Sequence, residues 1–319
     1  MLETLKMVRG AVSTKDVVPV LSHFMIYNGR IQGANGKVAI DAALPELPEI
    51  SVVVPAERFL KAIDACSSEP VLTLKDDKLQ IKAGKFTAKV SVMPSDAFPL
   101  STLDDGRVSV LPLNLLDVLR KLYPFVSTDA SRPWACSILL SDGYAYATNN
   151  VVLARTKLDW HEEPIALPVY AIDELLRIRD MPKEFRVSEN ALFFVYSKFW
   201  LKAQIFLDVW PETLVGLCEK ITGELDVVPA DLLSAVTTLK AFFPNEKAPI
   251  VVFGEEGVST QDGAHSASLA IGTMPTGLYR FEPLTDVLLI AEKADFTKYP
   301  APIPFRGQGV EGLLVGMRI

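Results

Sequence analysis

The chain has 319 residues, of which 49% are hydrophobic and 22% are charged, and its formal net charge is −7. This length and composition predict two or three globular domains with ordinary cores. The net acidity excludes a uniformly basic coat for nucleic acid. Basic residues gathered on one surface are still compatible with nucleic-acid binding, because the local field matters more than the total charge.

The three cysteines, Cys66, Cys136 and Cys218, are far apart and belong to no CxxC or Cys/His cluster. They predict neither a disulfide framework nor a zinc site, and we expect reduced thiols. The first residues lack a long apolar segment, and apolar runs such as VLLIA are too short to span a membrane. We therefore expect a cytoplasmic protein with no membrane partner, no metal and no cofactor.

The chain opens with a predicted helix, LETLKMVRGAV at residues 2–12, followed by three predicted strands in PVLSHFMIYN, GRIQGAN and GKVAIDAAL. A further strand, VVVP, ends at Pro55, which suits the first turn of a helix. In that helix, AERFLKAIDAC, the spacing of Phe59, Leu60 and Ile63 gives one apolar face. Three strands follow, in VLTL, LQIKA and GKFTAKVSV, and KDDK is predicted to form a tight turn between the first two.

The same layout returns four times along the chain. Helices are predicted after Pro112, Pro168, Pro229 and Pro283, so that successive helix-leading prolines lie roughly 55–60 residues apart. Each helix follows a strand-like run and precedes several short strands. One alternative is an ordinary α+β protein with chance prolines before its helices. A propeller or solenoid would need a shorter repeat without such a helix.

Six helix-plus-strands units, taken in pairs, predict three domains, at 1–104, 105–222 and 223–319. The boundaries fall in the polar segments STLDDGR and CEKITGE. The predicted fold class is α+β, with three pseudo-repeated domains in which paired helices are buried under sheets. Domains of this kind can stack in an arc, with helices inside and sheets outside, and two or three chains joined head to tail can close a ring.

Three segments resemble a known family, the bacterial-type DNA polymerase sliding clamps (the β subunit of DNA polymerase III). The end of the first domain resembles theirs in VPAERFLKAID and LTLKDDKLQIKAGKFTAKVSVMPSDAFP. YAYATNNVVLAR resembles a family strand that usually reads close to ATDGHRLA, and GLLVGMRI resembles a last strand that commonly ends MPMRL. The resemblance covers nearly the whole chain. The family's strand before the first helix is missing or replaced, and the chain is short, which is compatible with a divergent, phage-encoded clamp.

The resemblance implies a DNA sliding clamp, or processivity factor, that encircles duplex DNA without reading its sequence. The implied partners are double-stranded DNA, a DNA polymerase, a clamp loader and a second copy in a homodimeric ring at the nucleoid or replication site; a trimeric ring is an alternative. No enzyme is expected and no catalytic residue is proposed, because HExxH, GxSxG, Walker and GxGxxG motifs are absent from the sequence. The alternative function is a non-encircling scaffold, or an inhibitor that binds clamp-binding peptides.

The resemblance also implies three sets of site residues. Basic residues expected to face DNA are Lys6, Arg9, Arg58, Lys61, Arg120, Lys121, Arg177, Arg179, Lys240 and Lys293, with Lys15 in a loop. For each of them, an ordinary solvated helix face is the alternative. The fourth helix begins Pro168-Val169-Tyr170, where the family often has basic residues, and the last helix has more acidic than basic residues.

The second set is a hydrophobic pocket for partner peptides, formed by Trp134, Thr148, Leu153, Leu313, Val315 and Met317. Its alternative is a simple strand core. The sequence departs from the family at Asn150, Val151, Val152 and Gly316, so a different peptide preference is expected. The third set is the ring interface, at Phe98, Leu100, Leu269 and Ile271. For Phe98, burial inside its own domain is the alternative.

Overall fold

A computed structural model describes residues 1–14, 18–206, 208–219, 221–243, 248–261 and 266–318. The fold is α+β, as predicted. The chain separates into two compact units, of which the first contains residues 1–111 and 170–205 and the second residues 112–169 and 206–319. No helix among the described residues is long and apolar enough to cross a membrane.

All six predicted helices are present. They are α1 (Leu2–Arg9), α2 (Ala56–Asp64), α3 (Leu115–Leu122), α4 (Val169–Ile178), α6 (Leu232–Thr238) and α7 (Phe281–Leu288). In α2, Ala56, Phe59, Ala62 and Ile63 are buried, which matches the predicted apolar stripe except that Leu60 is half-buried. Pro283 lies in the first turn of α7, where its missing N–H breaks no helical hydrogen bond. A further helix, α5 (Glu212–Cys218), was not predicted.

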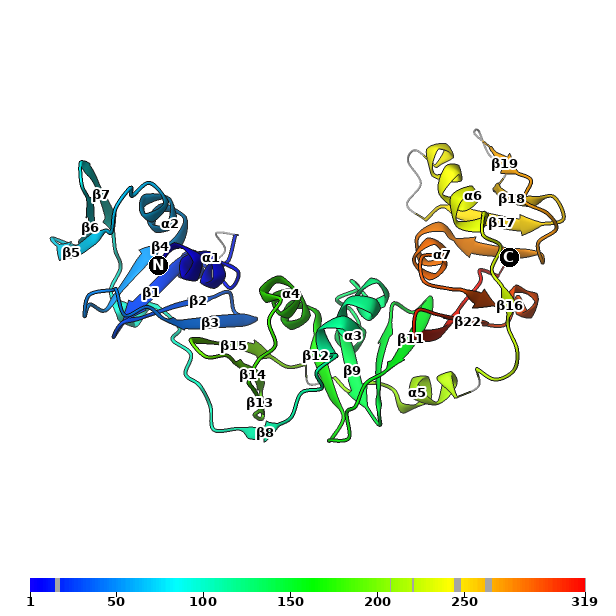
Figure 1. Ribbon diagram of the computed structural model, residues 1–319, viewed down its shortest axis with the longest axis horizontal. Coiled ribbons are helices and arrows are strands. Elements are labelled where there is room, and N and C mark those ends of the chain that lie inside the picture. The colour runs from blue at the N-terminus through cyan, green and yellow to red at the C-terminus, as the bar shows by residue number, and fades with distance from the viewer. Residues whose placement is uncertain (15–17, 207, 220, 244–247, 262–265, 319) are drawn as a thin grey trace. The chain divides into compact units, whose positions relative to one another are not determined.

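The first unit contains two antiparallel sheets (Figure 1). The larger sheet has the order β4 (Val52–Pro55), β1 (His23–Tyr27), β2 (Arg30–Ala34), β3 (Val38–Ala43), β15 (Phe199–Gln204), β14 (Ala191–Val195), β13 (Glu184–Val187) and β8 (Arg107–Ser109). The smaller sheet consists of β5 (Val71–Lys75), β6 (Lys78–Ala83) and β7 (Phe86–Ser91). Helices α1 and α2 pack against each other.

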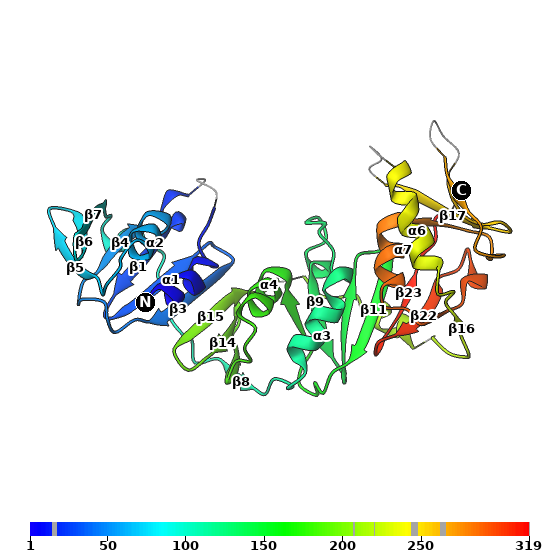
Figure 2. The same cartoon turned by 45° about the horizontal axis from the view of Figure 1, so that its top comes forward.

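The second unit repeats this plan (Figure 2). Its larger sheet has the order β12 (Ile165–Pro168), β9 (Ser137–Ser141), β10 (Tyr144–Thr148), β11 (Val152–Lys157), β23 (Val310–Leu314), β22 (Ile303–Gly307), β21 (Lys293–Ala294) and β16 (Asp226–Val227). The smaller sheet has the order β19 (Ser268–Leu269), β18 (Gly257–Thr260), β17 (Ile250–Gly254) and β20 (Gly277–Arg280). Helices α6 and α7 pack together.

The sheets follow one pairing rule within each predicted domain. The strand that leads into the helix of one repeat pairs with the first of the three strands of the other repeat. The pairs are β4 with β1, β8 with β13, β12 with β9, β16 with β21, and β20 with β17. This exchange ties the two repeats of a domain together through main-chain hydrogen bonds. The predicted domain boundaries stay a prediction, because the two compact units divide residues 105–222 between them.

A second rule joins the predicted domains to one another. The last strand of one set of three pairs antiparallel with the last strand of another, as β3 does with β15 and β11 does with β23. Cross-strand partners such as Ile40 and Leu201 fix the register of the first junction. Two last strands, β7 and β19, each have a single neighbour among the described strands.

The sheet of the first unit contains a buried polar network around Asp41 of β3, whose side chain is fully buried. Its carboxylate accepts hydrogen bonds from Tyr27 and Arg30, and from Gln32 Nε2 at 3.1 Å. Gln32 also binds the backbone of Ser101 in both directions, at 2.7 and 2.8 Å. Burial and the contact with Asp41 raise the pKa of Tyr27, so the phenol stays protonated and remains a donor. The network therefore fastens the segment around Ser101 to the sheet.

We expect Asp41→Ala to lower the free energy of unfolding by about 2–3 kcal/mol, because it leaves buried donors without their acceptor. Urea denaturation followed by tryptophan fluorescence measures this loss. The matched control is Asp64→Ala at an exposed position of α2, which should change stability by no more than about 0.5 kcal/mol. Equal midpoints for the two variants would contradict the role given to Asp41.

Candidate functional site

An apolar cluster lies on one face of the sheet in the second unit. Strand alternation directs Leu153 of β11 to the face opposite Val152 and Ala154, and α3 packs against β10 and β11. The buried members of the cluster are Leu139, Tyr146, Leu153, Trp210, Cys218 and Ile221. We call this set the outer cluster. It offers the kind of apolar surface that anchors short peptides.

Three of the predicted pocket residues meet in the outer cluster. Leu153 lies directly opposite Leu313 of β23, and Leu313 packs against the cluster. Trp134 packs edge-to-face on Trp210, with ring centroids 5.3 Å apart and an interplanar angle of 72°. The indole of Trp210 donates to Ser137 Oγ at 2.9 Å, which fixes the ring. The structure thus brings together Trp134, Leu153 and Leu313 from distant parts of the sequence.

The other three predicted pocket residues, Thr148, Val315 and Met317, are not among the residues of the outer cluster or those packed against it. Thr148 is buried, and its hydroxyl donates to Val152 O at 2.7 Å and accepts from Asn150 N at 3.1 Å. Its visible role is therefore to shape the turn between β10 and β11. Val315 is exposed and Met317 is half-buried, just beyond the end of β23.

The unpredicted helix α5 covers part of the outer cluster. Its residues Leu214, Val215 and Leu217 pack against the cluster, and the helix contacts both β11 and β23. Cys218, at the end of α5, is fully buried. The spacing of Leu214, Leu217 and Cys218 is the sequence signal that could have revealed a short amphipathic helix here. As the chain stands, its own helix contacts the surface predicted to bind partner peptides.

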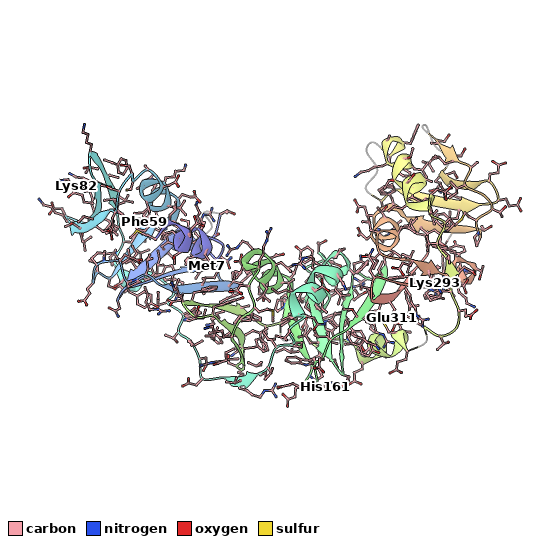
Figure 3. All side chains as sticks on the ribbon, in the orientation of Figure 1. Met7, Phe59, Lys82, His161, Lys293 and Glu311 are labelled. Carbon is pink, nitrogen blue, oxygen red and sulfur yellow. The ribbon has the colours of Figure 1, made fainter. Side chains whose placement is uncertain are left out.

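Charged side chains of β11, β22 and β23 form ion pairs with one another. Arg155 lies 2.7 Å from Glu311 and stacks over the Tyr144 ring, 4.4 Å from its centroid. Arg306 also contacts Glu311, at 3.2 Å, and donates to Ile221 O at 2.7 Å. Glu311 lies on β23 (Figure 3). The Arg306–Ile221 bond fixes the segment that follows α5, so the helix is tied down at its C-terminal end.

Nine of the eleven predicted DNA-facing residues fall into two groups. Five are engaged with carboxylates on the same or a neighbouring helix: Lys6 with Glu3, Arg9 with Glu57, Arg120 and Lys121 with Asp117, and Arg177 with Glu174. Four are exposed and have no described carboxylate within 4.0 Å: Arg58, Lys61, Arg179 and Lys240. Lys293 is exposed on β21 rather than on a helix, and Lys15 lies outside the described residues.

Arg177 has an additional structural contact. Its Nη2 atom donates to Met7 O, at the end of α1, at 2.7 Å. Gly10 makes room for it, because a Cβ atom on Gly10 would lie 2.3 Å from Arg177 Nη2. The guanidinium therefore joins α4 to α1, a contact that no sequence pattern predicted.

The helices are not basic as a set. In helices α1 to α7, the seven basic residues are Lys6, Arg9, Arg58, Lys61, Arg120, Lys121 and Arg177, and the nine acidic residues are Glu3, Glu57, Asp64, Asp117, Asp173, Glu174, Glu212, Glu282 and Asp286. A balance of this kind gives little net attraction for phosphates. Among the described residues, no cluster of histidine, cysteine, aspartate and glutamate side chains could hold a metal ion.

The predicted ring-interface residues differ in exposure. Phe98 is only 5% exposed and packs in a core cluster with Met25 and Val53 of its own predicted domain and with Trp200 of the next one, so it is buried within the chain. Leu100 is exposed. Leu269 belongs to β19, and Ile271, two residues later, is half-buried like Leu269.

No protein-family model and no curated protein matches the sequence. Solved structures of bacterial sliding clamps, however, match the whole chain. The C. crescentus beta sliding clamp aligns with a TM-score of 0.79 and 18% identity, over 100% of this chain and 96% of the other. The Bacillus subtilis DNA polymerase sliding clamp aligns with a TM-score of 0.81 and 17% identity, over 100% and 97%.

A third match is the Helicobacter pylori beta clamp bound to a DNA ligase peptide, with a TM-score of 0.76 and 14% identity over 99% of this chain and 97% of the other. The chain therefore has the sliding-clamp fold. More particularly, the fold is that of the beta subunit of bacterial DNA polymerase III, which a Thermotoga maritima structure also represents, with a TM-score of 0.80.

Cys218 provides a test of the helix cover. Burial raises the pKa of its thiol to about 12, so only about one thiol in 10⁴ is ionised at pH 8. We expect Cys218 to react with a thiol reagent at least tenfold more slowly than half-buried Cys66, measured by mass spectrometry of the labelled peptides. Leu217→Ala, which removes packing from α5, should speed the reaction of Cys218 and leave that of Cys66 unchanged. Equal rates at both cysteines would show that α5 does not cover the cluster.

Proposed function

We propose that this protein is a DNA sliding clamp that encircles duplex DNA and tethers a polymerase and other partners. The observation that carries the proposal is the pairing of last strands in a clamp fold. Two junctions are made within the chain, and β7 and β19 each have one edge that no described strand pairs with. An edge strand is a template for pairing with another chain. Pairing β7 of one copy with β19 of another would repeat the junction of β3 with β15.

Head-to-tail pairing of this kind closes a ring when the rotation between copies permits it. We propose two copies, which give twelve helix-plus-strands units around the ring. Leu269 lies on β19 and therefore at the proposed joint, with Ile271 and Leu100 as further apolar contacts. The three domains at 1–104, 105–222 and 223–319 are part of this proposal.

Attachment to DNA in this proposal is topological. Helices α1 to α7 carry nine acidic and seven basic residues, so affinity from phosphate neutralisation is small. Arg58, Lys61, Arg179 and Lys240 are the best candidates for loose phosphate contacts, because they are exposed and have no described acidic partner. We propose no catalytic groups, because a protein that is attached to DNA by topology alone performs no covalent chemistry.

Partner peptides are proposed to bind at the outer cluster, close to Trp134, Leu153, Leu313, Val315 and Met317. The support is the apolar character of this surface and the likeness to the Helicobacter pylori clamp, whose structure contains a DNA ligase peptide. A peptide anchor that reaches Leu153 would displace α5. The affinity of this site for peptides of the polymerase and the clamp loader would then depend on how readily α5 moves.

A second candidate is a non-encircling scaffold or inhibitor that binds the same peptides. The nearly balanced charge of the helices favours this second candidate, because such a balance gives little net attraction for DNA. The two candidates differ in whether the free edges of β7 and β19 meet.

We expect a mass near twice 35.0 kDa in solution, measured by light scattering across a dilution series. Hairpin geometry directs the N–H of Thr87 to the free edge of β7, so Thr87→Pro should remove an edge donor without breaking the pairing with β6. This variant should dissociate to monomers at concentrations where Thr87→Ala stays dimeric. A monomeric wild-type chain would count against closure and favour the scaffold.

Encirclement predicts retention that depends on DNA topology. Protein loaded onto nicked circular DNA by its clamp loader should stay bound in high salt during gel filtration. Cutting the circle once should release it, because the ring can then slide off the ends. Retention that is equal on circular and linear DNA, or absent on both, would contradict a sliding clamp.

A further inference from the structure

A cavity of about 530 Å³ lies in the second unit, at the end of the larger sheet where β11 stops and β22 turns into β23. Helix α3 contributes to its lining together with these strands and their turn. Its volume is in the range of small-molecule sites. None of the buried residues of the outer cluster lines it, and neither do the other residues of the proposed peptide site. The cavity is therefore separate from that site.

The charged residues of this cavity carry a positive surplus. Five are basic and three are acidic: Lys121, Arg155, Lys157, Lys293 and Arg306 against Asp117, Glu292 and Glu311. The chain as a whole, in contrast, has a net charge of −7. A concave surface with a charge surplus attracts ions of the opposite sign, because its walls concentrate the field. The ligand that this cavity favours is therefore an anion.

Strand pairing explains how these charges gather. Arg155 of β11 lies directly opposite Glu311 of β23. Glu311 also lies opposite Arg306 of β22, and Arg306 lies opposite Lys293 of β21. Directly opposed side chains share one face of a sheet, so this row contains three cations and a single carboxylate (Figure 3). One carboxylate cannot neutralise three cations.

The two arginines of this row are held in place by the protein. Arg155 lies 2.7 Å from Glu311 and stacks over the Tyr144 ring. Arg306 lies 3.2 Å from Glu311 and donates to Ile221 O at 2.7 Å. Their guanidinium groups therefore keep both charge and position without a ligand, and they supply a constant positive field.

Two lysines of the cavity are available for direct contacts. Lys157, at the end of β11, and Lys293, on β21, are exposed, and neither has a described carboxylate within 4.0 Å. Two strands lie between β11 and β21, so the backbones of these lysines are about 15 Å apart across the sheet. Their long, flexible side chains can converge on one ligand only if that ligand carries negative charge at more than one point.

Helix α3 adds a third lysine. Lys121 lies 3.0 Å from Asp117 on the same helix. It also reaches the turn between β22 and β23, because a Cβ atom on Gly309 would lie 3.9 Å from Lys121 Nζ. Gly309 has a φ angle of 77°, which favours glycine and keeps this side of the cavity free of a side chain.

We propose that this cavity binds a small molecule that carries two or more phosphate groups. Lys157 and Lys293 would each contact one phosphate, because ammonium groups form charge-assisted hydrogen bonds with phosphate oxygens. The row of Arg155 and Arg306 would strengthen the attraction through its field. A single phosphate would reach only one of the two lysines and would bind more weakly.

Two other anions fit the cavity less well. The backbone of duplex DNA is a continuous line of negative charge, which the carboxylates of Asp117, Glu292 and Glu311 would repel at the same surface. An acidic peptide brings one charge with each side chain, whereas a terminal phosphate carries nearly two. A compact polyphosphate therefore neutralises the two lysines with the fewest atoms.

The proposed site is independent of ring closure and of partner peptides. It contains no residue of β7 or β19 and none of Trp134, Leu153 and Leu313. Lys293 and Lys121 belong to the predicted DNA-facing set, but Lys157 does not. The experiment below can fail without affecting the proposed clamp function, and the reverse also holds.

The probe is inorganic triphosphate, and the measurement is isothermal titration calorimetry with the full chain in a buffer freed of divalent cations. We expect one triphosphate per chain, with an affinity that falls as salt rises. Orthophosphate, which reaches one lysine at a time, should bind at least about tenfold more weakly.

Paired substitutions separate the cavity from overall charge. Lys157→Ala combined with Lys293→Ala should weaken triphosphate binding at least about tenfold, because each lost ammonium leaves a phosphate without its partner. Lys82→Ala combined with Lys89→Ala is the matched control, since it removes the same charge from exposed strand positions of the first unit. It should leave the affinity within about twofold of the wild-type value. All four positions are exposed, and circular dichroism checks that both variants are folded.

Several outcomes would overturn the proposal. The absence of saturable binding at millimolar triphosphate would show that the cavity holds no such ligand. Equal losses in the two double variants would show that only overall charge matters. A duplex oligonucleotide that displaces triphosphate and needs Lys157 and Lys293 for its own binding would assign the cavity to DNA. Displacement by an equal concentration of a glutamate-rich peptide would identify an acidic protein segment as the occupant.

Discussion

Main-chain pairing between strand edges is the interaction on which the rest of this structure depends. Within a predicted domain, the exchange of leading strands binds two repeats together, and between domains the last strands join end sheets into longer ones. An unpaired edge leaves strong hydrogen-bonding groups without partners. Among the described strands, β7 and β19 are the two last strands that have no second neighbour, and the proposed ring joint would pair them.

Charge is distributed differently from what a simple DNA-binding protein would show. The helices carry both acidic and basic residues, and Asp117 and Glu57 form ion pairs with nearby basic side chains. The lysines of β6 and β7, in contrast, have no described carboxylate within 4.0 Å. A protein held on DNA by topology, as proposed, has little need of a strongly basic helix surface.

The outer cluster shows how one surface can serve both folding and binding. Trp210 and Leu153 are buried as core residues are, and α5 completes their burial. The apolar surface that makes this site a candidate for partner peptides is the same surface that α5 needs for its own stability, since so short a helix is marginal alone. Competition between α5 and a peptide follows directly from that shared surface.

The sequence by itself determined the local elements. Helical spacing at Phe59 and Ile63, alternation in LQIKA and the turn at Asp76-Asp77 depend on neighbouring residues only, and the predicted helices and strands were confirmed at all of them. Only the tertiary structure decided what these elements meet. The exchange of β8 and β16, the bond from Arg177 to Met7, the burial of Phe98 and the position of α5 all join distant segments. Local periodicity specifies which face of an element is apolar, but many partners can cover such a face, and only the folded chain selects one.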